Sequence, residues 1–226
     1  MTLALRVKEF AGILTPQEVR HAPDLLYMEG DISLLTEGSR VSVVGSRKAS
    51  ENGRKRAYHF SKYLVEAGIT VVSGLAEGID TVAHTAAIEL GGKTIAVLGT
   101  PLDKVYPKSN ADLITEIKTN HLAVSQFVRG HPSRAENFPR RNRTMALISD
   151  ATVIIEASEK SGTRHQGWEA LRIGRTLFIL DSVASDKSLT WPSEMIKYGA
   201  IVIDNDNIVD ALAELPICTG AVDFGF

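Results

Sequence analysis

The segment VSVVGSR, residues 41–47, is an apolar run that breaks into a turn containing a glycine and an arginine. Two further runs break in a similar way, TVVSGLAEGID at residues 70–80 and TIAVLGT at residues 94–100. Continuous apolar runs of this length are typical of strands that a parallel sheet buries on both faces. An open parallel sheet binds ligands at the carboxyl ends of its strands, where these turns would lie. The recurrence therefore predicts a ligand crevice along one edge of such a sheet.

The composition is that of a globular protein with one α/β domain. The chain has 226 residues, of which 44% are hydrophobic and 23% are charged, and its formal net charge is −2. No apolar run approaches the roughly 20 residues that span a bilayer, and the first ten residues lack a signal-like pattern. We therefore expect a cytoplasmic protein that does not contact a membrane. Because the net charge is slightly negative, any contact with nucleic acid must be made by a local basic patch.

Residue counts also bear on metals and disulfides. The single cysteine, Cys218, excludes an internal disulfide and a cysteine-based zinc site. The six histidines are scattered and form no close pair of ligands. We expect no metal site and no cofactor.

Apolar strands alternate with helical stretches from residue 40 onward, which predicts a doubly wound, mostly parallel α/β sheet with helices on both faces. The expected strands are residues 40–44, 69–72, 94–98, 122–126, 151–156, 176–180 and 200–203. The expected helices are residues 53–67, 81–90, 111–119, 141–149, 167–173, 193–198 and 208–215. This pattern is that of an extended Rossmann-like domain.

The predicted domain covers residues 39–216. Residues 1–38 have weak periodicity and are expected to be a short lead-in, although Thr15-Pro16 is typical of a helix start with threonine as the N-cap. Residues 217–226 are expected to be a C-terminal tail.

Gly45-Ser46-Arg47 directly follows the first expected strand. The backbone amides of this turn and the Ser46 hydroxyl could hold a phosphate, and Arg47 could then form a charge-assisted pair with it. The alternative is an ordinary turn between a strand and a helix, because the spacing is not that of the dinucleotide motif G-x-G-x-x-G.

The segment from residue 73 to residue 80 has two glycines, Gly74 and Gly78, which allow a ligand to approach the backbone closely. Together with Ser73 they are candidates for contact with phosphate. Asp80 is expected to cap the following helix rather than to act as an acid. His84 lies one turn beyond Asp80, and a structural histidine is favoured over a catalytic Asp/His pair.

The hexad Phe138-Pro139-Arg140-Arg141-Asn142-Arg143 concentrates positive charge beside an aromatic ring. Arginine binds phosphate in a bidentate manner and an aromatic ring can stack on an unpaired base, which together are typical of proteins that bind single-stranded nucleic acid. We expect the hexad at the N-terminus of a helix, where cations oppose the macrodipole and so indicate a bound anion. The alternative is a solvated basic helix start.

The segment from residue 161 to residue 169 follows the strand that ends at Glu156. Ser161-Gly162-Thr163 could orient a ribose or a base, and Glu169 could act as an acid or base in cleavage of an N-glycosidic bond. Alternatively, Glu169 is an acidic residue in the first turn of a helix and Trp168 packs in the core. The sequence leaves both interpretations open.

In their order along the chain, these motifs resemble the Rossmann-like domain of the DNA-processing protein A (DprA/Smf) family. The resemblance begins near Leu26-Tyr27-Met28-Glu29-Gly30-Asp31 and covers about residues 25–182. It is carried by the segments at residues 45–47, 73–80, 91–100, 102–107, 138–143, 156–163 and 174–175.

The resemblance implies a cytoplasmic bacterial protein that binds single-stranded DNA through an arginine-lined pocket and has no catalytic residues. It also implies a homodimer that helps to load a RecA-type recombinase during natural transformation. By position, Arg47 matches the arginine of the family's Gly-Ser/Thr-Arg turn, and residues 138–143 match its Phe-Pro-x-Arg-Asn-Arg segment. Ser73, Gly74 and Gly78 match its phosphate-facing turn. The segment Arg164–Glu169 departs from the family pattern, which has a small and apolar run there.

Two functions of different classes follow. The first is a non-enzymatic protein that binds single-stranded DNA and assists recombinase loading in DNA uptake and recombination. The alternative is a nucleotide-binding sensor, or a nucleoside-monophosphate N-glycosidase of the related lysine-decarboxylase-like phosphoribohydrolases, motivated by the carboxylate and histidine that the segment at residues 164–169 contains.

Overall fold

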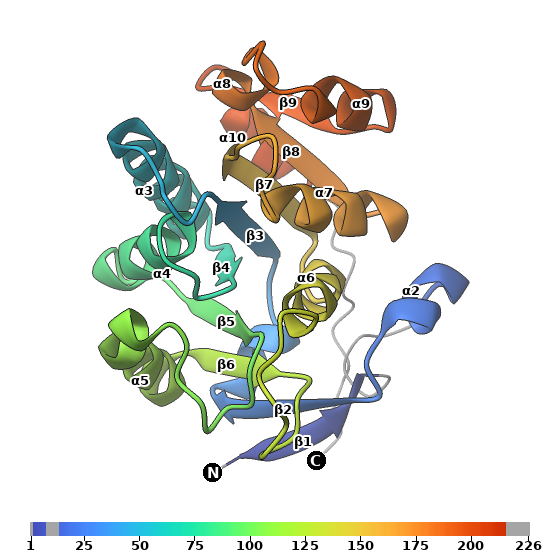
Figure 1. The fold of residues 1–226 in the computed structure, drawn as a ribbon. Helices are drawn as coiled ribbons and strands as arrows, with labels where there is room; N and C mark the ends of the chain where they lie inside the picture. The colour runs from blue at the N-terminus through green and yellow to red at the C-terminus, as the bar shows by residue number, and fades with distance from the viewer. Residues whose placement is uncertain (1, 8–13, 216–226) are drawn as a thin grey trace.

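Nine strands form one sheet in the computed structural model, which describes residues 2–7 and 14–215 (Figure 1). Their order across the sheet is β1-β2-β6-β5-β4-β3-β7-β8-β9. The strands are β1 Leu3–Arg6, β2 Leu25–Gly30, β3 Arg40–Gly45, β4 Thr70–Ser73, β5 Thr94–Leu98, β6 Leu122–Ser125, β7 Ala151–Glu156, β8 Thr176–Leu180 and β9 Ile201–Ile203. Strands β3 to β9 are parallel to one another. At one end of the sheet, β2 runs antiparallel to both of its neighbours, β1 and β6. The expected mostly parallel, Rossmann-like sheet is confirmed.

The chain reverses its direction of travel across the sheet at β3. From β3 the chain adds β4, β5 and β6 on one side, and then returns to place β7, β8 and β9 on the other. The carboxyl ends of β3 and β7 therefore lie side by side at a topological switch point. In open α/β sheets this is the place where the loops diverge and leave room for a ligand.

The described part of residues 1–38 contributes two strands to the sheet. The domain therefore does not begin at residue 39 as expected, and these residues are not a separate lead-in. Strand β2 pairs with β6, with Tyr27 opposite Ser125, and β1 pairs with β2. The expected helix start is confirmed, because α2 Pro16–His21 has Thr15 as its N-cap. Within α2, Glu18 forms a buried ion pair of 2.6 Å with Arg175. The expected tail at residues 217–226, which includes Cys218, lies outside the described residues.

Helices cover both faces of the sheet (Figure 1). One face carries α3 Glu51–Glu66, α4 Ile79–Glu89, α5 Ala111–Asn120 and α10 Ile208–Ala213, and the other carries α6 Asn137–Leu147, α7 Thr163–Arg172 and α9 Trp191–Lys197. Short helical segments are α8 Asp181–Ala184 and the 3₁₀ turns η1 Ile32–Leu35 and η2 Lys108–Asn110. Adjacent residues of strand β3 pack into the hydrophobic cores on opposite faces of the sheet. Val43 packs in a cluster with Phe60 of α3, and Val44 packs in a cluster with Met145 of α6.

Two helices begin four residues earlier than expected. Helix α6 begins at Asn137 rather than at residue 141, and α7 begins at Thr163 rather than at residue 167. Pro139 is compatible with the first turn of α6, because the amides of a first turn have no partner within the helix. In the part of the chain that the structure describes, no helix combines the length and the apolar character that crossing a membrane requires.

Candidate functional site

A pocket of about 620 Å³ lies beside the carboxyl ends of β3 and β7. Its walls come from the loop after β3, the first turn of α4, the first turns of α6, the loop after β7 and the first turn of α7. Its volume is in the range of sites that hold small molecules of roughly nucleotide size. The lining residues are Val44, Gly45, Ser46, Arg47, Lys48, Ala76, Asp80, Phe138, Pro139, Arg141, Asn142, Met145, Ser158, Ser161, Gly162, Thr163, His165 and Gln166.

The structure brings most of the predicted site residues together at this pocket, although their role in binding stays a prediction. The predicted residues that line it are Gly45, Ser46, Arg47, Phe138, Arg141, Asn142, Ser161, Gly162 and Thr163. The predicted residues that do not line it are Ser73, Gly74, Gly78, Arg140 and Arg143. Lys48, His165 and Gln166 line the pocket but were not among the predicted site residues.

One face of α6 forms a wall of the pocket. Phe138, Arg141, Asn142 and Met145 all line it, and they are spaced at three, four and seven residues from the first. Because residues at this spacing lie on one side of an α-helix, the early start of α6 decides which of the basic residues face the pocket.

Arg140 and Arg143 do not line this pocket, and their expected contact with DNA stays a prediction. The guanidinium of Arg140 lies 5.3 Å from the centre of the Phe127 ring, beside a separate pocket. Nε of Arg143 donates to Oε2 of Glu169 over 3.2 Å. Within helix α6 these two residues lie on faces other than that of Arg141.

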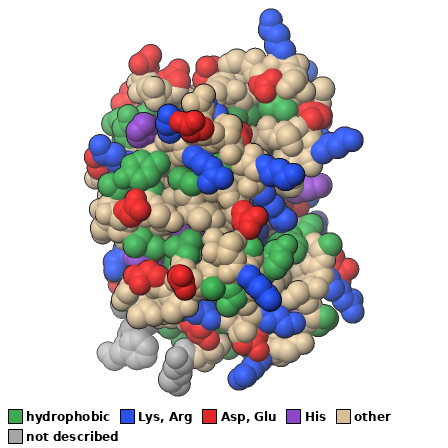
Figure 2. Space-filling model, turned by 60° about the vertical axis from the view of Figure 1, so that its left-hand side comes forward, with side chains coloured by type: hydrophobic (Ala, Val, Ile, Leu, Met, Phe, Trp, Pro, Cys, Tyr) green, Lys and Arg blue, Asp and Glu red, His purple; other side chains and the backbone are tan. Residues whose placement is uncertain are grey.

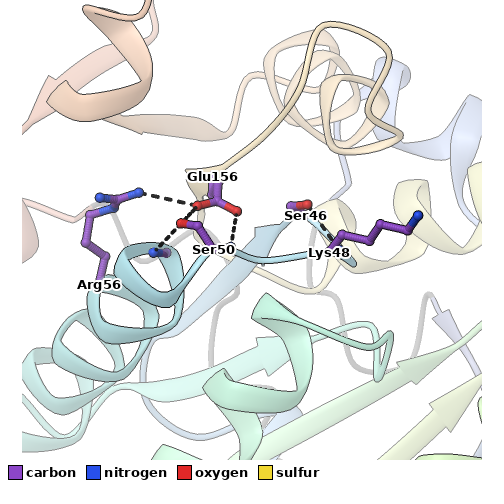
Figure 3. Close-up of polar contacts among 6 residues, drawn as sticks. Ser46, Lys48, Ser50, Arg56 and Glu156 are labelled. Carbon is purple, nitrogen blue, oxygen red and sulfur yellow. Dashed lines mark hydrogen bonds and ion pairs between the residues drawn. The ribbon is translucent and has the colours of Figure 1, made fainter.

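Glu156 at the end of β7 fixes the loop after β3. Its carboxylate accepts a 2.9 Å hydrogen bond from the Ser50 amide and further bonds from the Ser50 hydroxyl and Arg56 (Figure 3). Its backbone carbonyl accepts from the Ser46 amide over 2.8 Å. Figure 3 shows the Lys48 side chain extending away from this cluster. The loop between β3 and α3 is therefore anchored at both ends.

This anchored loop places two positively charged side chains at the mouth of the pocket. Arg47 and Lys48 are both exposed, and the guanidinium carbon of Arg47 lies 5.4 Å from the centre of the Phe138 ring. The Ser46 hydroxyl accepts from the Lys48 amide over 3.2 Å, which fixes the turn between them. An anion at the pocket mouth would meet positive charge from a loop of defined conformation.

Ser73 and Gly74 have a structural role rather than facing the pocket, which corrects the expectation for these two residues. The buried Ser73 hydroxyl donates to the Val43 carbonyl over 2.7 Å. The amides of Gly74 and Ala76 donate to Oδ2 of Asp80 at 3.2 and 3.3 Å. Because Asp80 already occupies these two amides, neither is available to a phosphate.

Gly78 rather than Asp80 is the N-cap of α4, and Asp80 lies in the first turn. Gly78 has φ +81°, and a Cβ there would overlap the carbonyl groups of Ser46 and Arg47. Glycine is needed because it alone adopts this conformation without strain and permits this approach. Gly78 thus allows α4 to pack closely against the Arg47 loop, and since it does not line the pocket, its expected contact with phosphate stays a prediction.

A buried charge pair underlies the pocket. Arg141 is 5% exposed, and its Nη1 donates to the Val97 carbonyl over 3.4 Å. Burial raises the pKa of the Asp80 carboxyl, and the nearby guanidinium of Arg141 and the two backbone amides oppose this shift. Since a guanidinium stays protonated in proteins, Arg141 adds a permanent positive charge to the pocket lining.

The N-terminus of α7 closes the pocket on the side of β7. Thr163 donates its amide to the Ser161 hydroxyl over 3.1 Å, so the turn before the helix is fixed. The positive end of a helix dipole favours an anion at this place. The first turn of α7 also contributes Gln166, which is 1% exposed and has neither amide atom hydrogen-bonded within the described residues.

Two residues considered for catalysis do not lie in a catalytic arrangement. The carboxylate of Glu169 bonds to Arg143 and, over 2.9 Å, to Arg172, and Glu169 does not line the pocket. Nδ1 of His84 lies 2.7 Å from Oγ1 of Thr94, and burial lowers the pKa of His84 to about 3. His84 is thus a neutral, buried histidine, as the structural interpretation expected.

Comparison with known proteins gives a consistent assignment. The family model described as DNA recombination-mediator protein A matches residues 4–214. DNA processing protein DprA of Streptococcus pneumoniae is 38% identical over 197 residues, which cover 87% of this chain and 68% of that protein. DprA of Bacillus subtilis is 31% identical over 194 residues, covering 86% and 65%, and protein Smf of Escherichia coli is 37% identical over 182 residues, covering 80% and 48%. The chain thus spans about half to two thirds of the length of these relatives.

Solved structures agree with these matches. The structure of DprA from S. pneumoniae superposes with a TM-score of 0.80 at 34% identity, covering 95% of this chain and 74% of that one. A structure from Helicobacter pylori, which concerns the single-stranded DNA binding mode of its DNA processing protein A, gives a TM-score of 0.79 at 26% identity and covers 95% and 96%. The molybdenum cofactor binding protein of Rippkaea orientalis, at 17% identity and a TM-score of 0.56 over 79% and 96%, shares the fold alone. On the extent of the family match and of the curated relatives, the chain belongs to the DNA recombination-mediator protein A family.

Proposed function

We propose that this chain binds single-stranded DNA without catalysis, and that the pocket between β3, α6 and α7 seats one nucleotide of the strand. The observation that carries this proposal is the grouping of Arg47, Lys48 and Arg141 with the Phe138 ring around a pocket of about 620 Å³. A single phosphate would leave most of this volume empty, whereas a nucleotide would contact both the positively charged side chains and the aromatic wall of the pocket.

The charge distribution supports binding at a local site. The net charge is −2, and over the face that carries α3, α4 and α5 acidic and basic side chains are interspersed (Figure 2). A duplex held by a broad basic surface would require a more uniform positive potential. A single strand needs only a short run of cations and a stacking surface, and Tyr106 extends that surface with its ring centre 5.6 Å from that of Phe138.

The wider role rests on the family. We propose that the chain acts as a cytoplasmic homodimer. This dimer would protect single-stranded DNA and assist the loading of a RecA-type recombinase in DNA uptake and recombination. Support comes from the family match over residues 4–214 and from relatives named as DNA processing proteins.

The alternative function, an N-glycosidase acting on nucleoside monophosphates, lacks a carboxylate in the expected place. Glu169 is held by Arg143 and Arg172, and the carboxylate of Asp80, which does line the pocket, accepts from two backbone amides. Release of a free base from nucleoside monophosphates, followed by chromatography, would establish that alternative, and the proposal predicts that none is released.

A gel-shift experiment tests the binding proposal. Single-stranded and double-stranded oligonucleotides of one sequence are compared at about 50 and 200 mM salt. We expect tighter binding of the single strand and a loss of affinity at the higher salt concentration. Equal affinity for both forms, or no binding of single strands at the lower salt concentration, would contradict the proposal.

A further inference from the structure

Two neighbouring arginines of α6 line two different pockets. Arg141 lines the pocket at β3 and β7, whereas Arg140 lines a separate cavity of about 420 Å³, which we call the second pocket. The lining of the second pocket also includes Tyr27 of β2, and Phe127 and His131 of the loop after β6. Its volume is in the range of sites that hold small ligands. The first turns of α6 therefore contribute an arginine to each of two cavities that also contain aromatic rings.

The Arg140 side chain is positioned by an aromatic stack. Phe127 is 2% exposed, and its ring stacks on that of His131 with ring centres 4.9 Å apart and an interplanar angle of 28°. The guanidinium carbon of Arg140 lies 5.3 Å from the centre of the Phe127 ring. Arg140 is nonetheless exposed, so its guanidinium group is accessible from solvent. An unpaired base can stack on such a group.

The guanidinium of Arg140 also has unused hydrogen-bond donors. Within the described residues its side chain forms no hydrogen bond and no ion pair, whereas Arg143 on the same helix pairs with Glu169. Asp24 is the one carboxylate among the described residues that line the second pocket, and it does not pair with Arg140. A guanidinium with free N–H groups binds phosphate in a bidentate manner. Arg140 can therefore contact both a phosphate and a base.

The two pockets lie along the same edge of the sheet. The first is at the carboxyl ends of β3 and β7, the second is at the carboxyl end of β6, and β5 lies between β3 and β6 in the sheet. The loop after β5 contacts both sides, because the Tyr106 ring centre is 5.6 Å from that of Phe138. On the other side, Nζ of Lys104 donates to the His131 carbonyl over 3.4 Å. Since Tyr106 and Lys104 are both exposed, a strand that leaves the first pocket meets a ring and a cation before the second.

We propose that the second pocket holds a further nucleotide of the single strand that occupies the pocket at β3 and β7, so that the strand crosses the first turn of α6. This inference rests on the proposed function, because the strand is the one seated in the first pocket. A helix with its side chains is about 10–12 Å across, which a few nucleotides can span. Arg47 in the first pocket and Arg140 in the second thus contact different phosphates.

Salt-dependent titrations test whether Arg140 contacts a phosphate of its own. Fluorescence anisotropy gives the slope of log affinity against log salt for an oligo-deoxythymidine of about 12 nucleotides, a length typical of single-strand sites. We expect Arg47→Ala and Arg140→Ala each to make the slope less negative by about 0.7, and the double variant by about 1.4. Lys62 is exposed on α3 and lines neither pocket, so Lys62→Ala is the control and should leave the slope unchanged.

Photo-crosslinking of the wild-type chain tests where the strand lies. An oligonucleotide of the same length with several 5-iododeoxyuridines is bound at one strand per chain and irradiated. Trypsin cleaves after Arg134, so His131 and Phe138 fall in different peptides. We expect crosslinks to the peptide that contains Phe138 and also to a peptide that contains His131 or Tyr27. Because this experiment uses the unaltered protein, it decides the question even if a variant does not fold.

A slope for Arg140→Ala equal to that of the wild-type chain would overturn the inference, and so would a double variant that matches Arg47→Ala. Crosslinks at the peptide with Phe138, with none at the peptides of His131 and Tyr27, would overturn it as well. In these cases a changed slope for Arg47→Ala leaves the proposed function in place. Failure of the wild-type chain to bind single strands at low salt would contradict the proposed function itself, and the inference with it.

Discussion

The guanidinium group of Arg141 lies directly over Gly74, in the space that a Cβ at residue 74 would occupy. This contact joins the first turns of α6 to the loop after β4. It places a buried cation beneath the pocket, near Asp80. The glycine is therefore required by packing, although its backbone donor is used by Asp80 and not by a ligand.

Gly74→Ala should displace Arg141 and destabilise the fold. We expect the free energy of unfolding to fall by about 1–3 kcal/mol, which is typical of an overpacked interior, and single-strand affinity to fall with it. Gly162→Ala is the matched control, because nothing lies within 4 Å of a Cβ there. Urea denaturation of both variants checks this, and equal unfolding free energies for the two would contradict the packing role of Gly74.

Arg47→Ala should remove one phosphate contact. For single-stranded DNA, the slope of log affinity against log salt becomes less negative by about 0.7 for each phosphate that the protein no longer neutralises. Lys62→Ala removes the same charge from the far part of α3, where Lys62 is exposed beside Glu66, and should leave the slope unchanged. Anisotropy titrations over a range of salt concentrations measure both slopes. Identical slopes for Arg47→Ala and the wild-type chain would exclude Arg47 from the DNA interface.

Glu169→Gln should strengthen DNA binding. The Glu169 carboxylate is 8% exposed and neutralises Arg143, which is 41% exposed, together with Arg172. Removing its charge frees both guanidinium groups and raises the local positive potential. We expect a lower dissociation constant for single strands and a steeper salt dependence, measured by the same titrations. Weaker binding by a folded Glu169→Gln protein would show that the carboxylate has a direct part in the function.

His84 should make the fold less stable in mild acid. Burial, with His121 and Arg141 as further causes, lowers the pKa of folded His84 to about 3, whereas an unfolded histidine titrates near 6.5. Between these values the unfolded chain binds one more proton at this position than the folded chain. The contribution of His84 to stability is therefore present above pH 6.5 and declines as the pH falls, by about 1.4 kcal/mol per pH unit.

Urea denaturation between pH 7 and pH 5 measures this dependence. The raised pKa of Asp80 acts in the opposite direction, so the wild-type slope is compared with that of His84→Gln, in which Asp80 is retained. The variant should lose less stability than the wild-type chain over this range. The same loss in both proteins would show that His84 is protonated in the folded state.

The sequence was sufficient to predict the parallel part of the sheet and a pocket at the carboxyl ends of its strands. Buried strands such as β3 and β7 appear as continuous apolar runs, and their turns must meet at one edge of the sheet. Strands β1 and β2 escaped prediction because β2 pairs with β6, which is distant in the sequence, and β1 in turn pairs with β2. Short edge strands have little periodic signal of their own.

The hexad shows why individual site residues were harder to predict. Shifting the start of α6 from residue 141 to Asn137 places residues 138–143 in one continuous helix. Arg140 and Arg143 then lie against Phe127 and Glu169, and of the three arginines Arg141 alone lines the pocket. Helical spacing from Phe138 would have selected Arg141, Asn142 and Met145, whereas no local pattern in the sequence indicated that Gln166 is buried beside the pocket.

Photo-crosslinking locates bound single-stranded DNA directly and so tests whether the pocket between β3, α6 and α7 holds it. An oligonucleotide containing 5-iododeoxyuridine is bound to the chain at low salt and irradiated, and the modified peptides are mapped by mass spectrometry. We expect crosslinks to the peptide that contains Phe138 or to the one that contains His165, both of which line the pocket. Crosslinks confined to β1, α2 or the outer surface of α5, with none at the pocket, would show that the strand binds elsewhere.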